Sequence, residues 1–114
     1  MNKPMNRKQA LAELITKVEA GEIVTAYDAS RIWPTGFAHA INASHGSLDA
    51  ALALHKAVLP YGYDQFETFS LSGEVVMKRL KPVDRFYGWS DGNPARAWLL
   101  AIIKALHAME KDDG

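Results

Sequence analysis

The stretch NPARAWLLAIIKALHAME, from Asn93 to Glu110, decides the fold that the sequence predicts. Asn93 suits an N-cap because its side-chain oxygen can accept from an unpaired amide of the first turn, and Pro94 fits the first helical position. Apolar residues then recur at steps of three and four: Ala95, Trp98, Leu99, Ile102, Ile103, Leu106 and Met109. We therefore expect a long C-terminal helix that forms the spine of the core.

Composition indicates one globular domain. The chain has 114 residues, of which 48% are hydrophobic, so it can bury a core without metal or disulfide support. Thirteen basic residues balance thirteen acidic ones, which gives no overall attraction to nucleic acid or to an anionic membrane. There is no cysteine, signal-peptide pattern or apolar run of spanning length. A cytoplasmic protein with no membrane segment is expected.

Two further helices are predicted before the C-terminal one. The first, Arg7 to Ala20, follows a capping residue at Asn6 and ends at Gly21, which is free to take the left-handed conformation. The second, Leu48 to Leu59, is capped by Ser47. Residues 22–43 between them are ambiguous: residues 23–27 could be a short strand or lead into a helical turn, and residues 37–43 could form one turn.

A hairpin precedes the last helix. Tyr63 to Leu71 and Glu74 to Lys81 are rich in β-prone residues and flank a Ser-Gly turn, and Phe86 to Trp89 could add a third strand or an aromatic loop. The pattern predicts a single α+β domain over 1–114, with two or three antiparallel strands packed between helices in α-β-α layers. Residues 1–5 and 111–114 are expected to be flexible tails.

Three motifs in this order resemble a known family. GSLDAALALHKAVLP at Gly46–Pro60, the aromatic-rich hairpin, and NPARAWLLAIIKALHA at Asn93–Ala108 resemble the phage ABA sandwich domain family of small phage and prophage proteins. The first helix, QALAELITKVEAGE, shares in the resemblance. It implies helices layered around a sheet and a phage or prophage origin, and it implies no catalytic or binding residues.

No motif in the chain indicates catalysis, a cofactor or a metal. The four histidines lack ligand spacing, no nucleophile elbow surrounds a serine, and the glycines form no phosphate-binding loop. His55 lies on an otherwise apolar helix face, where a hydrogen-bonded core histidine is the common explanation.

Aromatic and cationic residues are the remaining candidates for function. Tryptophan, tyrosine and arginine dominate protein interfaces, although the same aromatics could serve the core. The predicted partner-binding residues are Arg31, Trp33, Tyr61, Tyr63, Arg85, Tyr87 and Trp89. Surplus apolar residues, such as Leu54 and Leu100, leave a homodimer open.

The leading hypothesis is a non-enzymatic phage protein that binds a host macromolecule, with a protein partner favoured, in host takeover or anti-defence such as CRISPR inhibition. One alternative is a small-ligand or nucleotide binder that uses Gly92 and Asn93 at the start of the last helix. Another is a single-stranded nucleic-acid binder that uses Lys78, Arg79, Arg85 and Trp89, which the zero net charge disfavours.

Overall fold

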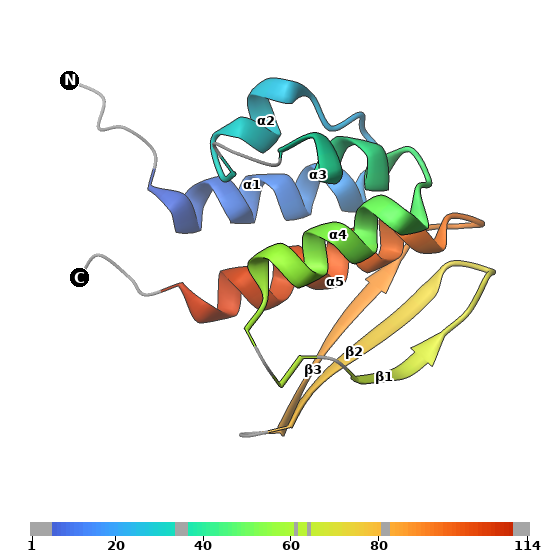
Figure 1. The fold of residues 1–114 in the computed structure, drawn as a ribbon. Coiled ribbons are helices and arrows are strands. Elements are labelled where there is room, and N and C mark those ends of the chain that lie inside the picture. Colours follow the sequence, from blue (N-terminus) through green and yellow to red (C-terminus); the bar gives the residue numbers. More distant parts are fainter. Residues whose placement is uncertain (1–5, 34–36, 61, 64, 81–82, 111–114) are drawn as a thin grey trace.

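The computed structural model describes residues 6–33, 37–60, 62–63, 65–80 and 83–110, so the two predicted tails lie outside the described residues. Figure 1 shows helices gathered on one side of a three-stranded antiparallel sheet of order β1-β2-β3. This confirms the predicted α+β class, with a long C-terminal helix. The elements are α1 (Arg7–Glu19), α2 (Ala26–Ser30), α3 (Phe37–Ser44), α4 (Leu48–Val58), β1 (Gln65–Phe69), β2 (Glu74–Leu80), β3 (Val83–Trp89) and α5 (Pro94–Met109).

Helix α5 is the centre of the molecule. It contacts β2 and β3 on one side and α1, α3 and α4 on the others. Every residue from Ala95 to Ile103 is buried, so the helix is enclosed all round and has no exposed polar face along this stretch. The apolar stripe predicted from the sequence is thus only part of the buried surface.

The layers differ from the predicted α-β-α order. Helix α5 makes the principal helix–sheet contacts, and the other helices surround its remaining sides (Figure 1). The opposite sheet face carries charged residues such as Glu67 and Arg85, which stay in solvent because burying them would cost their hydration. An antiparallel sheet with one solvated face is a common solution.

The predicted hairpin and third strand both form. Val75 pairs with Gly88 and Met77 with Phe86, and these residues turn toward the core. Their neighbours on β3 are exposed, whereas Val76 of β2, which pairs with Tyr87, is 5% exposed. Strand β1 pairs with β2 through a register shift between Phe66 and Thr68.

Strand β3 lies directly against the backbone of α5 at Gly88. A Cβ atom placed there would lie 1.9 Å from the Ala97 carbonyl oxygen and 2.8 Å from its carbon. Only a residue without a side chain fits this contact. The buried Gly88 therefore fixes how the strand rests on the helix.

The ambiguous segment 22–43 is helical where it is regular. Thr25 caps α2 in a capping box with Asp28, and α3 follows after residues that are not described. The predicted alternative of a strand at residues 23–27 is wrong, because Thr25 and Asp28 satisfy each other's backbone amides and so start a helix instead.

Local signals for the helix ends are confirmed. The side chains of Asn6, Ser47 and Asn93 each accept from an amide of the first turn of α1, α4 and α5. Gly21 follows α1 with a φ of 78°. Among the described residues, no helix has the length and apolarity needed to cross a membrane.

Candidate functional site

The outer face of the sheet exposes two large aromatic rings. Tyr87 and Trp89 of β3 are 57% and 56% exposed, and Arg85 lies two residues earlier on the same face. Their orientation follows from strand alternation, because Phe86 and Gly88 between them are buried against α5. These three predicted partner-binding residues therefore lie together on the open face.

Part of the charge on this face is neutralised within the protein. Arg85 Nε donates to Glu67 Oε2 at 2.8 Å, and this hydrogen bond lowers the pKa of Glu67 and raises that of Arg85. Lys78 is the cross-strand neighbour of Arg85, and its positive charge also lowers the pKa of Glu67. Glu74 differs, because its exposed carboxylate makes no hydrogen bond or ion pair with the described residues. Glu74 is the cross-strand neighbour of Trp89.

A pocket of about 330 Å³ opens where β3 meets α5. On the helical side, Lys104 donates to the Tyr87 carbonyl oxygen at 2.8 Å and pairs with Glu19 at 3.3 Å. The lining residues are Glu19, Glu74, Tyr87, Gly88, Trp89, Leu100 and Lys104. The pocket is thus lined by the exposed aromatic residues and lies at the β3 edge of the sheet.

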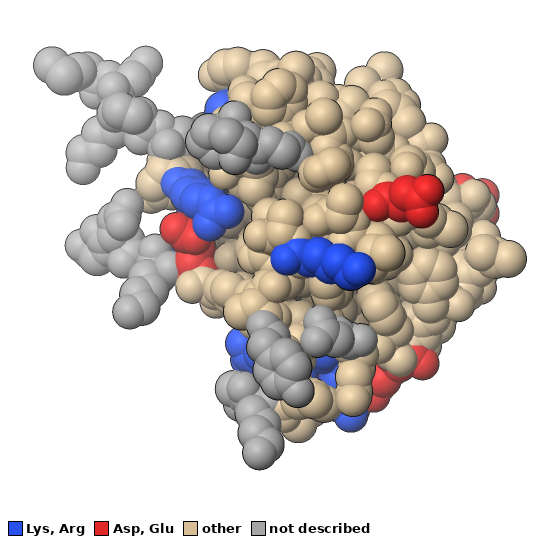
Figure 2. All heavy atoms as spheres, in the orientation of Figure 1, with Lys and Arg blue, Asp and Glu red and all other residues tan. Residues whose placement is uncertain are grey.

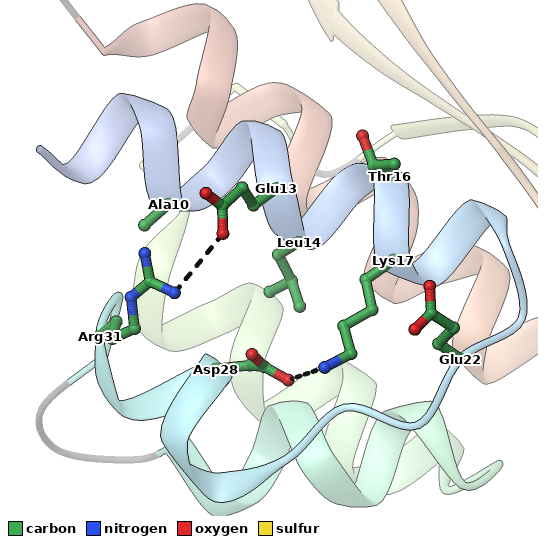
Figure 3. Close-up of a pocket in the computed structure, with 8 residues that line it drawn as sticks. All are labelled: Ala10, Glu13, Leu14, Thr16, Lys17, Glu22, Asp28 and Arg31. Atoms are coloured by element: carbon green, nitrogen blue, oxygen red, sulfur yellow. Dashed lines mark hydrogen bonds and ion pairs between the residues drawn. The ribbon is translucent and has the colours of Figure 1, made fainter. Parts of the chain in front are cut away.

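A second pocket, of about 320 Å³, lies between α1 and the segment that carries α2 (Figure 3). Its cations point at its acids: Lys17 Nζ is 2.6 Å from Asp28 Oδ2, and Arg31 is 3.6 Å from Glu13 Oε1. Burial raises the pKa of Asp28, but hydrogen bonds from Lys17 and Thr25 and the charge of Lys17 together bring it below its usual value. Since these groups hold the two segments together, neither cation is free for a ligand, and of the lining acids only the Glu22 carboxylate makes no hydrogen bond or ion pair with the described residues.

Three other aromatics were predicted to bind a partner, and the two that the structure describes belong to the core. Trp33 is 4% exposed, and its buried Nε1 finds no acceptor among the described residues. Tyr63 is 3% exposed, and its hydroxyl accepts from Arg79 at 3.1 Å. Tyr61 lies outside the described residues. Trp33 and Tyr63 therefore cannot reach a partner in this conformation.

Arg31 sits apart from the open sheet face. It lines the pocket beside α1, pairs with Glu13, and lies over the Tyr27 ring at 5.3 Å from the centroid. Its contacts hold α1 and α2 together, so the structure does not bring it into one surface with Tyr87 and Trp89.

The predicted ligand site at the start of α5 is occupied by the chain itself. Asn93 accepts from the Arg96 amide at 3.0 Å and donates to the Ser44 carbonyl oxygen at 3.4 Å. Gly92 donates its amide to the Ser72 carbonyl oxygen at 2.7 Å. The Asn93 backbone amide donates to the Ser90 carbonyl oxygen at 2.9 Å, so both backbone amides are used within the chain and only the second N–H of the Asn93 side chain is left for a ligand.

The histidine predicted to be structural has a hydrogen-bonded core environment. His55 is buried, and its Nδ1 accepts from Trp98 Nε1 at 3.1 Å. Nδ1 must therefore be unprotonated. The Phe66 ring contacts His55, and the Phe69 ring contacts Trp98. Among the described residues, no three histidine or acidic side chains are grouped as a metal site requires.

Charge gives little support to the nucleic-acid alternative. On the face shown in Figure 2, lysines and arginines are scattered among uncharged residues. Arg79 turns to Tyr63 and Asp84, and Arg85 is paired with Glu67, so only Lys78 remains of the predicted cations without an ion pair among the described residues.

The sequence analysis did not predict the buried cation Arg96. Arg96 is 8% exposed, and its guanidinium donates to three carbonyl oxygens: that of Val18 in the last turn of α1, that of Glu22 just after this helix, and that of Ser44 at the end of α3. Burial lowers its pKa. The role is structural, and its signal was an arginine on the first turn of an otherwise apolar helix.

Comparison with protein-family models, curated proteins and solved structures found no match. The resemblance to the phage ABA sandwich family therefore stays a prediction that rests on the sequence motifs.

Proposed function

We propose that the chain is a non-enzymatic binding protein that holds a protein partner on the outer face of its sheet, at β3. The observation that carries this proposal is the exposure of Tyr87 and Trp89, 57% and 56%, on a face that the helices leave open. Tyrosine and tryptophan contribute most of the binding free energy at many interfaces, because they bury large areas with few rotatable bonds.

The surroundings of the two rings support the same proposal. Gly88 packs the strand directly against α5, so the rings project from a rigid element. Binding a partner would therefore cost little conformational entropy in ordering them. Arg85 and Glu67 form a polar rim beside them. If the resemblance to phage proteins holds, the partner is a host macromolecule.

The test is capture from a bacterial host lysate, compared between variants. The double variant Tyr87→Ala/Trp89→Ala should lose a captured protein at least tenfold. Tyr27→Ala is the matched control, because Tyr27 is 70% exposed but lies on α2. Equal loss in both variants, or in neither, would overturn the assignment of the site.

The nucleic-acid alternative is separated in the same experiment. Capture through phosphate contacts would vanish after nuclease treatment and fall steeply with salt. Capture of a protein by aromatic contacts should survive the nuclease and change little between low and physiological salt.

A further inference from the structure

Tyr87 and Trp89, whose side chains are exposed, also direct their backbone N–H and C=O groups away from β2, toward the free edge of the sheet. The Ser90 amide donates to Gly73 at 3.0 Å, so Ser90 and, by alternation, Gly88 and Phe86 direct their polar groups at β2. Tyr87 and Trp89 consequently direct theirs away from the sheet. The Lys104 ammonium on the Tyr87 carbonyl oxygen confirms that this group faces away from β2.

The charges around this edge do not balance. The pocket has the carboxylates of Glu19 and Glu74 and a single cation, Lys104, which lies 3.3 Å from Glu19. Glu74 is left without a cation, next to two aromatic rings whose faces are electron-rich. Carboxylate and rings together are complementary to a positively charged group.

We propose that the partner segment is an extended peptide with a lysine or arginine, which adds to β3 as a fourth strand and places its cation over Trp89 and beside Glu74. This inference rests on the proposed function and specifies its partner. Addition of a strand to an exposed sheet edge is a recurrent mode of peptide recognition, with main-chain bonds for affinity and side-chain pockets for specificity.

The geometry of a sheet permits this contact. Glu74 and Trp89 are paired across β2 and β3, and strands lie about 4.8 Å apart, so a peptide residue opposite Trp89 would be about 10 Å from Glu74. A lysine or arginine lying across the indole ring spans most of that distance. A peptide amide could share the Tyr87 carbonyl oxygen with Lys104, because a carbonyl oxygen has two lone pairs.

The proposal is tested by selecting a displayed library of random nine-residue peptides on the full chain. Peptides that bind the wild type and fail on Trp89→Ala should be enriched in lysine or arginine at one position. On Glu74→Lys, an exposed substitution that spares the core, the same library should lose this enrichment. A Trp89-dependent pool without a basic residue would overturn the inference and leave the proposed function standing.

Backbone pairing is tested on one selected peptide by methylating its amides singly. Loss of affinity of at least tenfold at alternate amides is expected, because only every second amide of an added strand faces β3. Uniform tolerance of methylation would overturn the fourth-strand arrangement. Selection of no Trp89-dependent peptide, together with lysate capture unaffected by Tyr87→Ala/Trp89→Ala, would remove both this inference and the proposed function.

Discussion

Gly88→Ala tests the contact on which both the fold and the exposed rings depend. The added methyl group would lie 1.9 Å from the Ala97 carbonyl oxygen, whereas real Cβ atoms essentially never approach other atoms within 3.0 Å. Relief of the clash requires 3.0 − 1.9 = 1.1 Å of additional separation between β3 and α5. The obstructing atom is backbone of a buried helix, so no side-chain rotation can relieve it.

The expected cost follows from that displacement. Extra methylene groups in a packed core commonly cost about 1–3 kcal/mol, and a backbone shift of this size between two central elements belongs at the upper end or beyond it. We therefore expect Gly88→Ala to lower the free energy of unfolding by about 3 kcal/mol or more. Urea unfolding followed by the fluorescence of the three tryptophans would measure it.

The matched control is Gly92→Ala, in the turn that leads into α5. Its φ is +68° and no atom lies within 4 Å of an added Cβ, so only backbone strain of about 1 kcal/mol is expected. If Gly88→Ala cost no more than Gly92→Ala, the close approach of β3 to α5 would be refuted.

Three further predictions concern polar contacts. Arg96→Met should lower the free energy of unfolding by about 2–4 kcal/mol in urea, because three carbonyl oxygens at helix ends lose their donor, and a loss under about 1 kcal/mol would contradict that role. Trp98→Phe should lower the free energy of unfolding by about 1–3 kcal/mol, because it keeps a ring but removes the donor to the buried Nδ1 of His55. An unchanged urea midpoint would count against this hydrogen bond. The pKa of Asp28 is lower in the folded than in the unfolded state. Its ionised carboxylate therefore stabilises the fold fully above the unfolded pKa, and this stabilisation is lost as the pH falls through the folded pKa. The stability gap between wild type and Asp28→Asn should therefore narrow from about pH 5 downward, and a gap that widened would contradict the lowered pKa.

Features set by neighbouring residues could be predicted from the sequence. Asn93 and Ser47 cap their helices because the capping bond closes within three residues, and Gly21 ends α1 because only glycine takes a positive φ without strain. The Ser-Gly turn predicted the β1–β2 hairpin for the same reason. The capping bonds and the φ of Gly21 are local, whereas Gly73 of the turn also lies against the end of β3, because a Cβ added there would be 1.9 Å from the Ser90 carbonyl oxygen.

Features set by distant packing could not be predicted. Leu54 and Leu100 were expected to be surplus residues for a homodimer, yet they are 1% and 2% exposed. A single apolar stripe describes a helix with one neighbour, whereas α5 has neighbours on all sides. Trp33 is in the core for a related reason: its burial is decided by elements far away in the sequence.

Only part of the candidate site could be predicted from the sequence. Residue type identified Tyr87 and Trp89, but their exposure depends on which alternate residues of β3 meet the helix. Ala97 exposes its backbone on α5, and only Gly88 can lie against it, so the register that buries Gly88 turns both rings outward. Trp33 and Tyr63 have the same chemistry without such a constraint, and they are buried.

The same register explains why the rings and an unpaired backbone edge coincide. In a strand, side chains alternate between the faces and peptide groups alternate between the edges, so Tyr87 and Trp89 direct rings to one face and polar groups to one edge. An exposed edge invites association, and lysines are a usual guard. Lys104 covers the Tyr87 carbonyl oxygen but leaves the rings and Glu74 open. This arrangement favours a partner that supplies both a strand and a cation over one that is merely apolar.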